Sequence, residues 1–277
     1  MKISYLKSVL ILSMLLVVIT ACNRSGKSTS DSKEAVVEVE VFDAVKIKNE
    51  IVEIIQEIPD TREIAEMVKT AGASYILDLT VPVESAEKML TSAQLGMGMG
   101  MYAFDMQYAN VYNRIDKVNE IVALQQQLVV RVGVENELSQ LQKYIDRLRA
   151  NANHPDSVDY LVTQAMNDAN RQLAASDRAD IYAYTVIGGN IEAMYVMSQL
   201  AILANNNTQL LALIGEQRER ISTMFSLFEL MSSDPGIKPV YDGLLPVFNL
   251  FENNETITES HLIEMVPVIE KVRNSLI

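Results

Sequence analysis

Apolar residues recur at helical spacing along most of the chain after residue 43. The isoleucines between residues 47 and 58 form one stripe, and similar stripes continue to residue 276. Residues three and four apart share one face of a helix, so each stripe predicts a helix with a buried side. The alternation typical of a strand is confined to residues 37–41, where valine alternates with glutamate. The pattern therefore predicts an all-α protein, organised as a multi-helix bundle.

Two segments, residues 95–111 and 182–203, are apolar on nearly every side. A helix of that kind is usually buried at the centre of a domain. Both segments contain glycine, and Gly96 and Gly100 lie one helical turn apart. Small residues at this spacing allow another helix to approach closely. We expect these two segments to be central helices, with the glycines used in packing inside the protein.

The two central segments share a short sequence pattern, which we call the internal echo. Phe104-Asp105-Met106-Gln107-Tyr108 can be laid over Ile191-Glu192-Ala193-Met194-Tyr195, so that each has an acid followed three residues later by tyrosine. Repeats in helical proteins often stack into one core. The echo indicates two similar halves, residues 43–152 and 153–277, packed through their central helices. Chance is the alternative for a match this short.

The N-terminus has the three parts of an export signal in the right order. Lys2 and Lys7 precede a nearly unbroken apolar run over residues 9–19, which is short for a membrane-spanning helix. Ile19-Thr20-Ala21-Cys22 follows and resembles the lipobox of bacterial lipoproteins. The resemblance implies that residues 1–21 are a signal peptide and that Cys22 carries diacylglycerol, usually with a further acyl chain such as palmitate. The alternative is an ordinary secretory signal with a chance cysteine.

The residues after Cys22 indicate where the lipidated protein goes. Aspartate in the next position usually retains lipoproteins of Gram-negative cells in the inner membrane, and here Asn23 occupies it. By this resemblance we expect an outer-membrane lipoprotein, with the domain on the periplasmic or the surface side. Residues 23–35 are polar and serine-rich, so we expect residues 22–42 to comprise the lipidated cysteine and a flexible tether. Residues 43–277 then form the all-helical domain.

Charge and cysteine content narrow the classes of partner. The net charge is −13, and removing Lys2 and Lys7 with the signal peptide lowers it to −15. An acidic surface repels nucleic acid, so we exclude a nucleic-acid partner. Cys22 is the only cysteine, so no disulfide stabilises the mature domain. The expected partners are the membrane, through the lipid on Cys22, and an envelope protein.

No motif for catalysis, metal binding or a cofactor stands out. The chain has two histidines, His154 and His261, and neither follows a glutamate at the spacing of carboxylate di-iron bundles. Cysteine clusters, calcium loops and the nucleophile elbow of hydrolases are absent. We therefore expect no metal, no cofactor and no catalytic residues.

The best candidate for a ligand-binding site combines tyrosines and acids on the two central segments. Its members recur at steps of three and four residues and so share a helix side in each segment; they are Tyr102, Asp105, Tyr108 and Tyr112, with Glu192 and Tyr195 opposite. A buried carboxylate needs a partner. Tyrosine hydroxyls, Asn190 or backbone donors would make this a structural network. A ligand or cation between the halves would make it a site.

The mature chain also resembles a set of uncharacterised helical envelope lipoproteins with no established activity. The residues that carry the resemblance are Pro59, Glu63, Ile64, Gly72-Ala73-Ser74-Tyr75, Leu95-Gly96, Tyr102-Ala103-Phe104-Asp105, Tyr108, Ala109 and Tyr112. Members usually have glycine before the tyrosine that matches Tyr102, and here Met101 stands there. The resemblance implies a helical lipoprotein and adds no activity.

Three functions remain open on the sequence alone. The first is a non-enzymatic lipoprotein that binds a partner or acts as a scaffold at the membrane. The second is a lipoprotein that binds a small molecule or ion between the halves, near Asp105 and Glu192. The third, which has the least support, is an envelope hydrolase. A carbohydrate ligand is disfavoured because the chain has no tryptophan for stacking on sugars.

Overall fold

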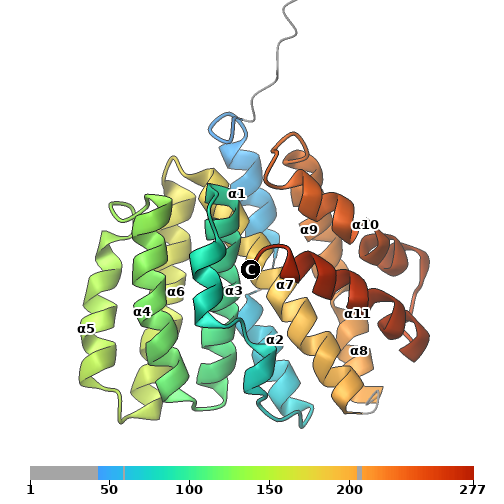
Figure 1. Cartoon of the computed structure of the whole chain (residues 1–277), viewed down its shortest axis with the longest axis horizontal. Coiled ribbons are helices and arrows are strands. Elements are labelled where there is room, and N and C mark those ends of the chain that lie inside the picture. Colours follow the sequence, from blue (N-terminus) through green and yellow to red (C-terminus); the bar gives the residue numbers. More distant parts are fainter. Residues whose placement is uncertain (1–42, 59, 205–207) are drawn as a thin grey trace, which may run out of the picture. The chain divides into compact units, whose positions relative to one another are not determined.

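The computed structural model describes residues 43–58, 60–204 and 208–277, and most of this part of the chain is helical (Figure 1). All described residues belong to one compact unit. No β-strand occurs among them, and the predicted all-α multi-helix bundle is confirmed. The predicted signal peptide, Cys22 and the alternating valines lie outside the described residues. The similarity of the two halves stays a prediction.

The described residues form eleven α-helices and three short 3₁₀ helices. They are α1 (Lys48–Glu57), α2 (Thr61–Thr70), η1 (Leu77–Leu79), η2 (Val83–Lys88), α3 (Ser92–Val111), α4 (Ile115–Val132), η3 (Ser139–Leu141), α5 (Gln142–Ala150), α6 (Pro155–Ala175), α7 (Ala179–Leu203), α8 (Thr208–Glu216), α9 (Arg218–Leu230), α10 (Lys238–Asn253) and α11 (Glu259–Asn274).

The two helices that are apolar all round, α3 and α7, form the centre. Nearly every residue of both is buried, and they contact each other more extensively than any other pair of helices. Glycine makes this approach possible. A Cβ on Gly100 would overlap the carbonyl oxygen of Thr185, and a Cβ on Gly188 would overlap that of Met97. The predicted use of glycine for internal packing is therefore confirmed.

Helix α7 is long and apolar enough to cross a membrane, and it is the one described helix that meets this criterion. However, 72% of its most apolar stretch is buried inside the protein. Packing against neighbouring helices accounts for this composition, because a core helix is also apolar on all sides.

The other helices pack around this central pair in two groups (Figure 1). Helices α2, α4 and α6 pack on α3, and α5 packs on α6 at the edge. Helices α1, α8 and α11 pack on α7, while α9 and α10 extend that side through contacts with α1 and α11. Helix α5 therefore has the fewest neighbours on the α3 side, which leaves room beside it.

Local signals place several helix ends where the pattern predicts them. The Asp60 side chain accepts a hydrogen bond from the Arg62 N–H and caps α2, and Gly72 follows that helix with a positive φ of 83°. Asp156 and Ser157 are of residue types that often cap a helix, but both lie inside α6. The helix begins at Pro155, because proline at the first position has no N–H that needs a partner.

Two segments are less helical than their apolar spacing predicts. Residues 134–148 carry one continuous stripe, but α5 begins only at Gln142, after a turn and η3. Gly133 adopts the left-handed conformation and ends α4 just before this stripe. Val134 and Leu138 are nevertheless buried, because a turn can bury apolar residues at the same spacing as a helix. Residues 84–90, predicted to begin a helix, form η2 instead.

Between α2 and α3 the chain runs through a segment that we call the strap, residues 73–91. It contains η1 and η2 and no α-helix. Such backbone has few partners of its own, so its N–H and C=O groups must find them elsewhere. Tyrosine and acid residues identified from the sequence supply several of these partners, and Arg131 and Arg273 supply others.

Candidate functional site

The tyrosines of α3 hold the strap by its backbone. The hydroxyl of Tyr102 donates to Pro82 O at 2.8 Å, and that of Tyr112 donates to Ala73 O at 2.6 Å. The Tyr108 hydroxyl donates to Ser74 O at 3.2 Å. Burial raises the pKa of all three tyrosines, that of Tyr112 to about 12, so the hydroxyls remain protonated donors at neutral pH.

The same tyrosines pack against a ring that the strap supplies. The ring centroid of Tyr75 lies 4.8 Å from that of Tyr108 and 5.8 Å from that of Tyr112. Ile76 N–H also donates to the Tyr108 hydroxyl at 3.1 Å, so this hydroxyl both gives and accepts a hydrogen bond. Aromatic pairs at these separations are favourable. The tyrosine spacing therefore serves packing and hydrogen bonding against the strap.

Asp105 lies between Tyr102 and Tyr108 on this side of α3 and is fully buried. Its Oδ2 accepts a hydrogen bond from Val81 N–H at 2.7 Å, whereas its Oδ1 has no partner among the described residues. Burial and then the nearby Glu192 carboxylate raise the pKa of Asp105 well above its ordinary value, against the lowering effect of Val81 N–H and Arg273. The backbone donor expected from the sequence is present for one oxygen of two.

Glu192, on α7, is also fully buried and forms a forked ion pair with Arg273 of α11. Arg273 Nε lies 2.7 Å from Oε2 and Nη2 lies 2.8 Å from Oε1. The guanidinium also donates to Leu79 O in the strap and stacks 4.1 Å from the ring centre of Tyr195. Burial raises the pKa of Glu192, whereas Arg273 lowers it. The ion pair thus joins α7, α11 and the strap.

The sequence reasoning missed Arg273, although a signal for it exists. Arg273 lies four residues after Ile269 and seven after Val266, so it belongs to the apolar stripe of the last helix. An arginine inside such a stripe must be buried with an acid, or it must leave the stripe. Asn190, expected as a partner for the acids, instead donates to Val186 O and accepts from Arg220.

The six candidate residues therefore lie in one connected network. Their polar groups face the strap and Arg273. Among the described residues no group of three or more metal-ligating side chains occurs. The arrangement can hold irregular backbone in place and can keep a proton on Asp105. Glu192 and the tyrosine hydroxyls of α3 already have partners inside the protein.

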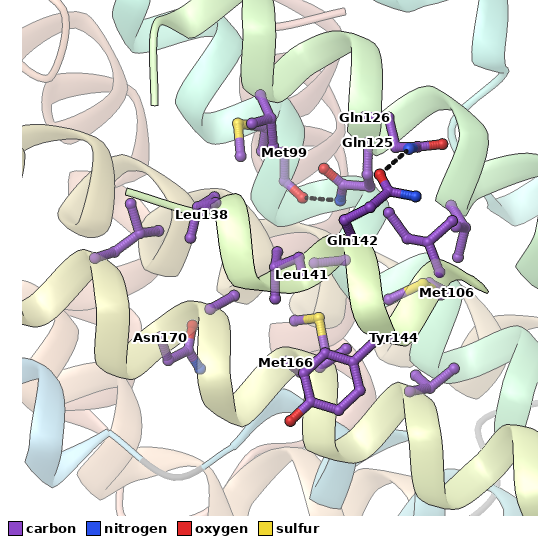
Figure 2. A pocket seen from close by; sticks show the side chains of 18 of the residues that line it. Met99, Met106, Gln125, Gln126, Leu138, Leu141, Gln142, Tyr144, Met166 and Asn170 are labelled. Carbon is purple, nitrogen blue, oxygen red and sulfur yellow. Dashed lines mark hydrogen bonds between the residues drawn. The ribbon is translucent and has the colours of Figure 1, made fainter. Parts of the chain in front are cut away.

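A pocket of about 350 Å³ lies between α3, α4, α5 and α6, beside the poorly covered helix α5 (Figure 2). Fifteen of its 23 lining residues are aliphatic or methionine, so its walls are apolar. Met99 and Met106 come from α3 and Met166 from α6. Ala165 and Ala169, one turn apart on α6, leave space that larger side chains would fill. Ligand pockets in proteins typically start at about this volume.

Several polar side chains around this pocket make hydrogen bonds inside the protein. Gln125 donates to Met99 O at 2.8 Å, and Gln126 donates across the pocket to Gln142 at 3.3 Å (Figure 2). Gln142 in turn donates to Asp146 at 2.9 Å. The Tyr144 hydroxyl is bound to Asp168. The walls therefore present a mainly apolar surface, in which the three glutamines and Tyr144 already have hydrogen-bond partners.

Sequence reasoning did not find this pocket, and no pattern in the sequence could have located it. Its walls consist of half-buried residues such as Val122, Val129 and Met166. Their spacing is that of ordinary core positions. Only the distance between α4 and α5 in the folded protein leaves the space unfilled.

Comparison with known proteins adds no relative. No protein-family model, curated protein or solved structure matches this chain.

Proposed function

We propose that this protein is a non-enzymatic lipoprotein of the bacterial outer membrane that binds a small apolar ligand in the pocket between α3, α4, α5 and α6. The observation that carries the proposal is the pocket itself. It is large enough for a small molecule and mainly apolar, and the side chains of Gln125, Gln126 and Gln142 in its walls already make hydrogen bonds inside the protein. The lipobox resemblance at Ile19–Cys22 supports the anchor, and the resemblance to envelope lipoproteins is consistent with it.

This proposal makes the role of the non-enzymatic lipoprotein more specific. In place of an unspecified partner or scaffold, the protein holds a small ligand close to the membrane. The alternative site near Asp105 and Glu192 has less support. Arg273 and Val81 N–H already engage these acids, and the tyrosines engage the strap. The contacts described give catalysis no support, since the Ser139 hydroxyl in the pocket wall makes no hydrogen bond to a basic side chain among them.

Native mass spectrometry on residues 23–277, the mature chain without its lipidated cysteine, incubated with envelope extract, tests the binding function. We expect extra mass that is lost in Ala169→Leu, which fills the pocket. Ala212→Leu is the matched control, because Ala212 is an exposed alanine in the middle of α8 and outside the pocket. A clean monomer mass for the unmodified chain contradicts the proposal. Mass lost only in Asp105→Ala moves the site to the alternative position.

The anchor is tested separately by growth with labelled palmitate. We expect label on the intact protein and none on Cys22→Ser. Label that persists in this variant overturns the anchor at Cys22 and leaves the pocket unaffected.

A further inference from the structure

We propose that the pocket between α3, α4, α5 and α6 takes an uncharged aliphatic molecule, an inference that rests on the proposed function and names the class of its ligand. The residues that line the pocket and its volume indicate three properties of the ligand. These are its aliphatic or aromatic character, its charge and its size.

The walls favour an aliphatic over an aromatic ligand. Tyr144 supplies the one aromatic ring in the lining, and its hydroxyl is held by Asp168. Sites for planar aromatic ligands gain from stacked or edge-on rings, and a single ring offers little of this. Fifteen of the other 22 lining residues are aliphatic side chains or methionines, and three of these fifteen are methionines. Methionine has an unbranched, adaptable side chain that follows the contour of a flexible chain.

The charge of the walls favours a neutral ligand. Glu135 is the one charged side chain in the lining, and no lysine, arginine or histidine lines the pocket. A carboxylate or phosphate brought inside would lose its hydration without gaining a cation, which is unfavourable. Gln125 and Gln126 each already donate a hydrogen bond inside the protein, and Ser139 and Asn170 are neutral, so none of these side chains supplies a counter-charge. A hydroxyl or similar neutral end group can remain at the rim, where Val130 is 63% exposed.

The volume sets the size. A dry cavity of about 150 Å³ accommodates benzene, with its six carbon atoms. At that ratio a pocket of about 350 Å³ holds roughly a dozen non-hydrogen atoms. A straight-chain alcohol of ten carbons fits this estimate and satisfies the other two features.

Isothermal titration calorimetry on residues 23–277, which include every described helix, tests the inference with three probes of similar size. They are 1-decanol, decanoate and naphthalene, which differ in charge or in aromatic character. We expect 1-decanol to bind at least tenfold more tightly than either of the others. Ala169→Leu and, separately, Ala165→Leu should each weaken binding of 1-decanol at least tenfold, whereas Ala212→Leu should not change it.

The outcomes separate the ligand class from the site. Tighter binding of naphthalene, or equal binding of decanoate, overturns the uncharged aliphatic class while leaving the pocket as the binding site. Binding of no probe, or binding that survives both pocket-filling variants with the helical circular dichroism intact, overturns the pocket as well. Circular dichroism on each variant shows whether it is folded. Because Ala165 and Ala169 are replaced separately, the test remains valid if one of the two variants misfolds.

The aliphatic chain could come from a free molecule or from the acyl chains on Cys22. Hydrogen exchange on the lipidated protein in phospholipid nanodiscs, compared with residues 23–277, distinguishes the two sources. Added protection of residues 138–148 in the lipidated protein assigns the pocket to its own acyl chains. Equal hydrogen exchange of residues 138–148 in the two proteins assigns the pocket to a freely diffusing ligand.

Discussion

At the scale of single residues, the features visible in the sequence serve the fold. Tyr102, Tyr108 and Tyr112 are spaced along α3 in a way that also suits a binding face. In the folded protein their hydroxyls reach carbonyl oxygens of the strap. Spacing along a helix shows which side chains share a face, but it does not show what lies opposite. The opposite segment here is irregular backbone, whose path no periodic pattern specifies.

Asp105→Asn is expected to stabilise the protein at neutral pH and to flatten its dependence on pH. Because the folded-state pKa of Asp105 is raised, the folded protein holds a proton that the unfolded chain releases. Stability therefore falls as the pH rises from the ordinary carboxyl pKa of about 4 towards the folded-state pKa. Asparagine retains an oxygen for Val81 N–H and carries no charge to bury. Urea unfolding at several pH values measures the difference between the two proteins.

The difference in stability between Asp105→Asn and the wild-type protein should vanish at low pH. There Asp105 is protonated in both the folded and the unfolded protein. A variant that is destabilised equally at every pH would show that the carboxyl contributes by packing alone. Asp242→Asn is the control, because Asp242 is exposed on α10 and pairs only with Lys238 among the contacts described.

At the scale of elements, helix positions follow from apolar periodicity, and most helix ends follow from local chemistry. Asp60 and Gly72 delimit α2 as their residue types predict. The stripe over residues 134–148 shows the limit of this reasoning. Apolar spacing indicates which residues are buried, and a turn with η3 buries them as well as a helix does. Only Gly133, before the stripe, signals a break.

The crossing of α3 and α7 is the contact most sensitive to added volume. Gly100→Ala is expected to destabilise the protein by about 1–3 kcal/mol, because the new methyl group meets backbone that cannot move aside. Gly215→Ala is the matched control, since a Cβ there would come no closer than 3.9 Å to its neighbours. That change should stabilise α8 by about 0.5–1 kcal/mol, through the better helix propensity of alanine. Chemical denaturation measures the stability of both variants. If Gly100→Ala and Gly215→Ala change stability by similar amounts, the close contact of α3 with α7 is not the cause of the loss at Gly100.

At the scale of the whole molecule, the fold class was predictable and the pocket beside α5 was not. Two segments apolar on all sides indicate two central helices, because burial on all sides requires neighbours on all sides. Which neighbours leave a gap depends on how α4, α5 and α6 pack around α3. That arrangement depends on many side-chain contacts between distant segments, such as the bond from Gln126 to Gln142.

Arg273 gives the sharpest test of how these distant segments depend on each other. Arg273→Met leaves Glu192 buried without its counter-charge and Leu79 O without its donor. We expect a loss of about 3–5 kcal/mol in the free energy of unfolding. Adding Glu192→Leu removes the isolated charge and should restore most of that loss, leaving about 1 kcal/mol for the strap carbonyl.

Urea unfolding of both variants measures these energies, and native-state hydrogen exchange shows where they act. Arg273 belongs to α11 and contacts both α7 and the strap. Arg273→Met should therefore speed hydrogen exchange in all three segments, including the centre of α7. Exchange that rises only at the end of α11 would show that this helix separates from the bundle on its own. A double variant as unstable as the single one would show that the guanidinium stabilises the protein mainly through Tyr195 and Leu79, rather than through the Glu192 charge.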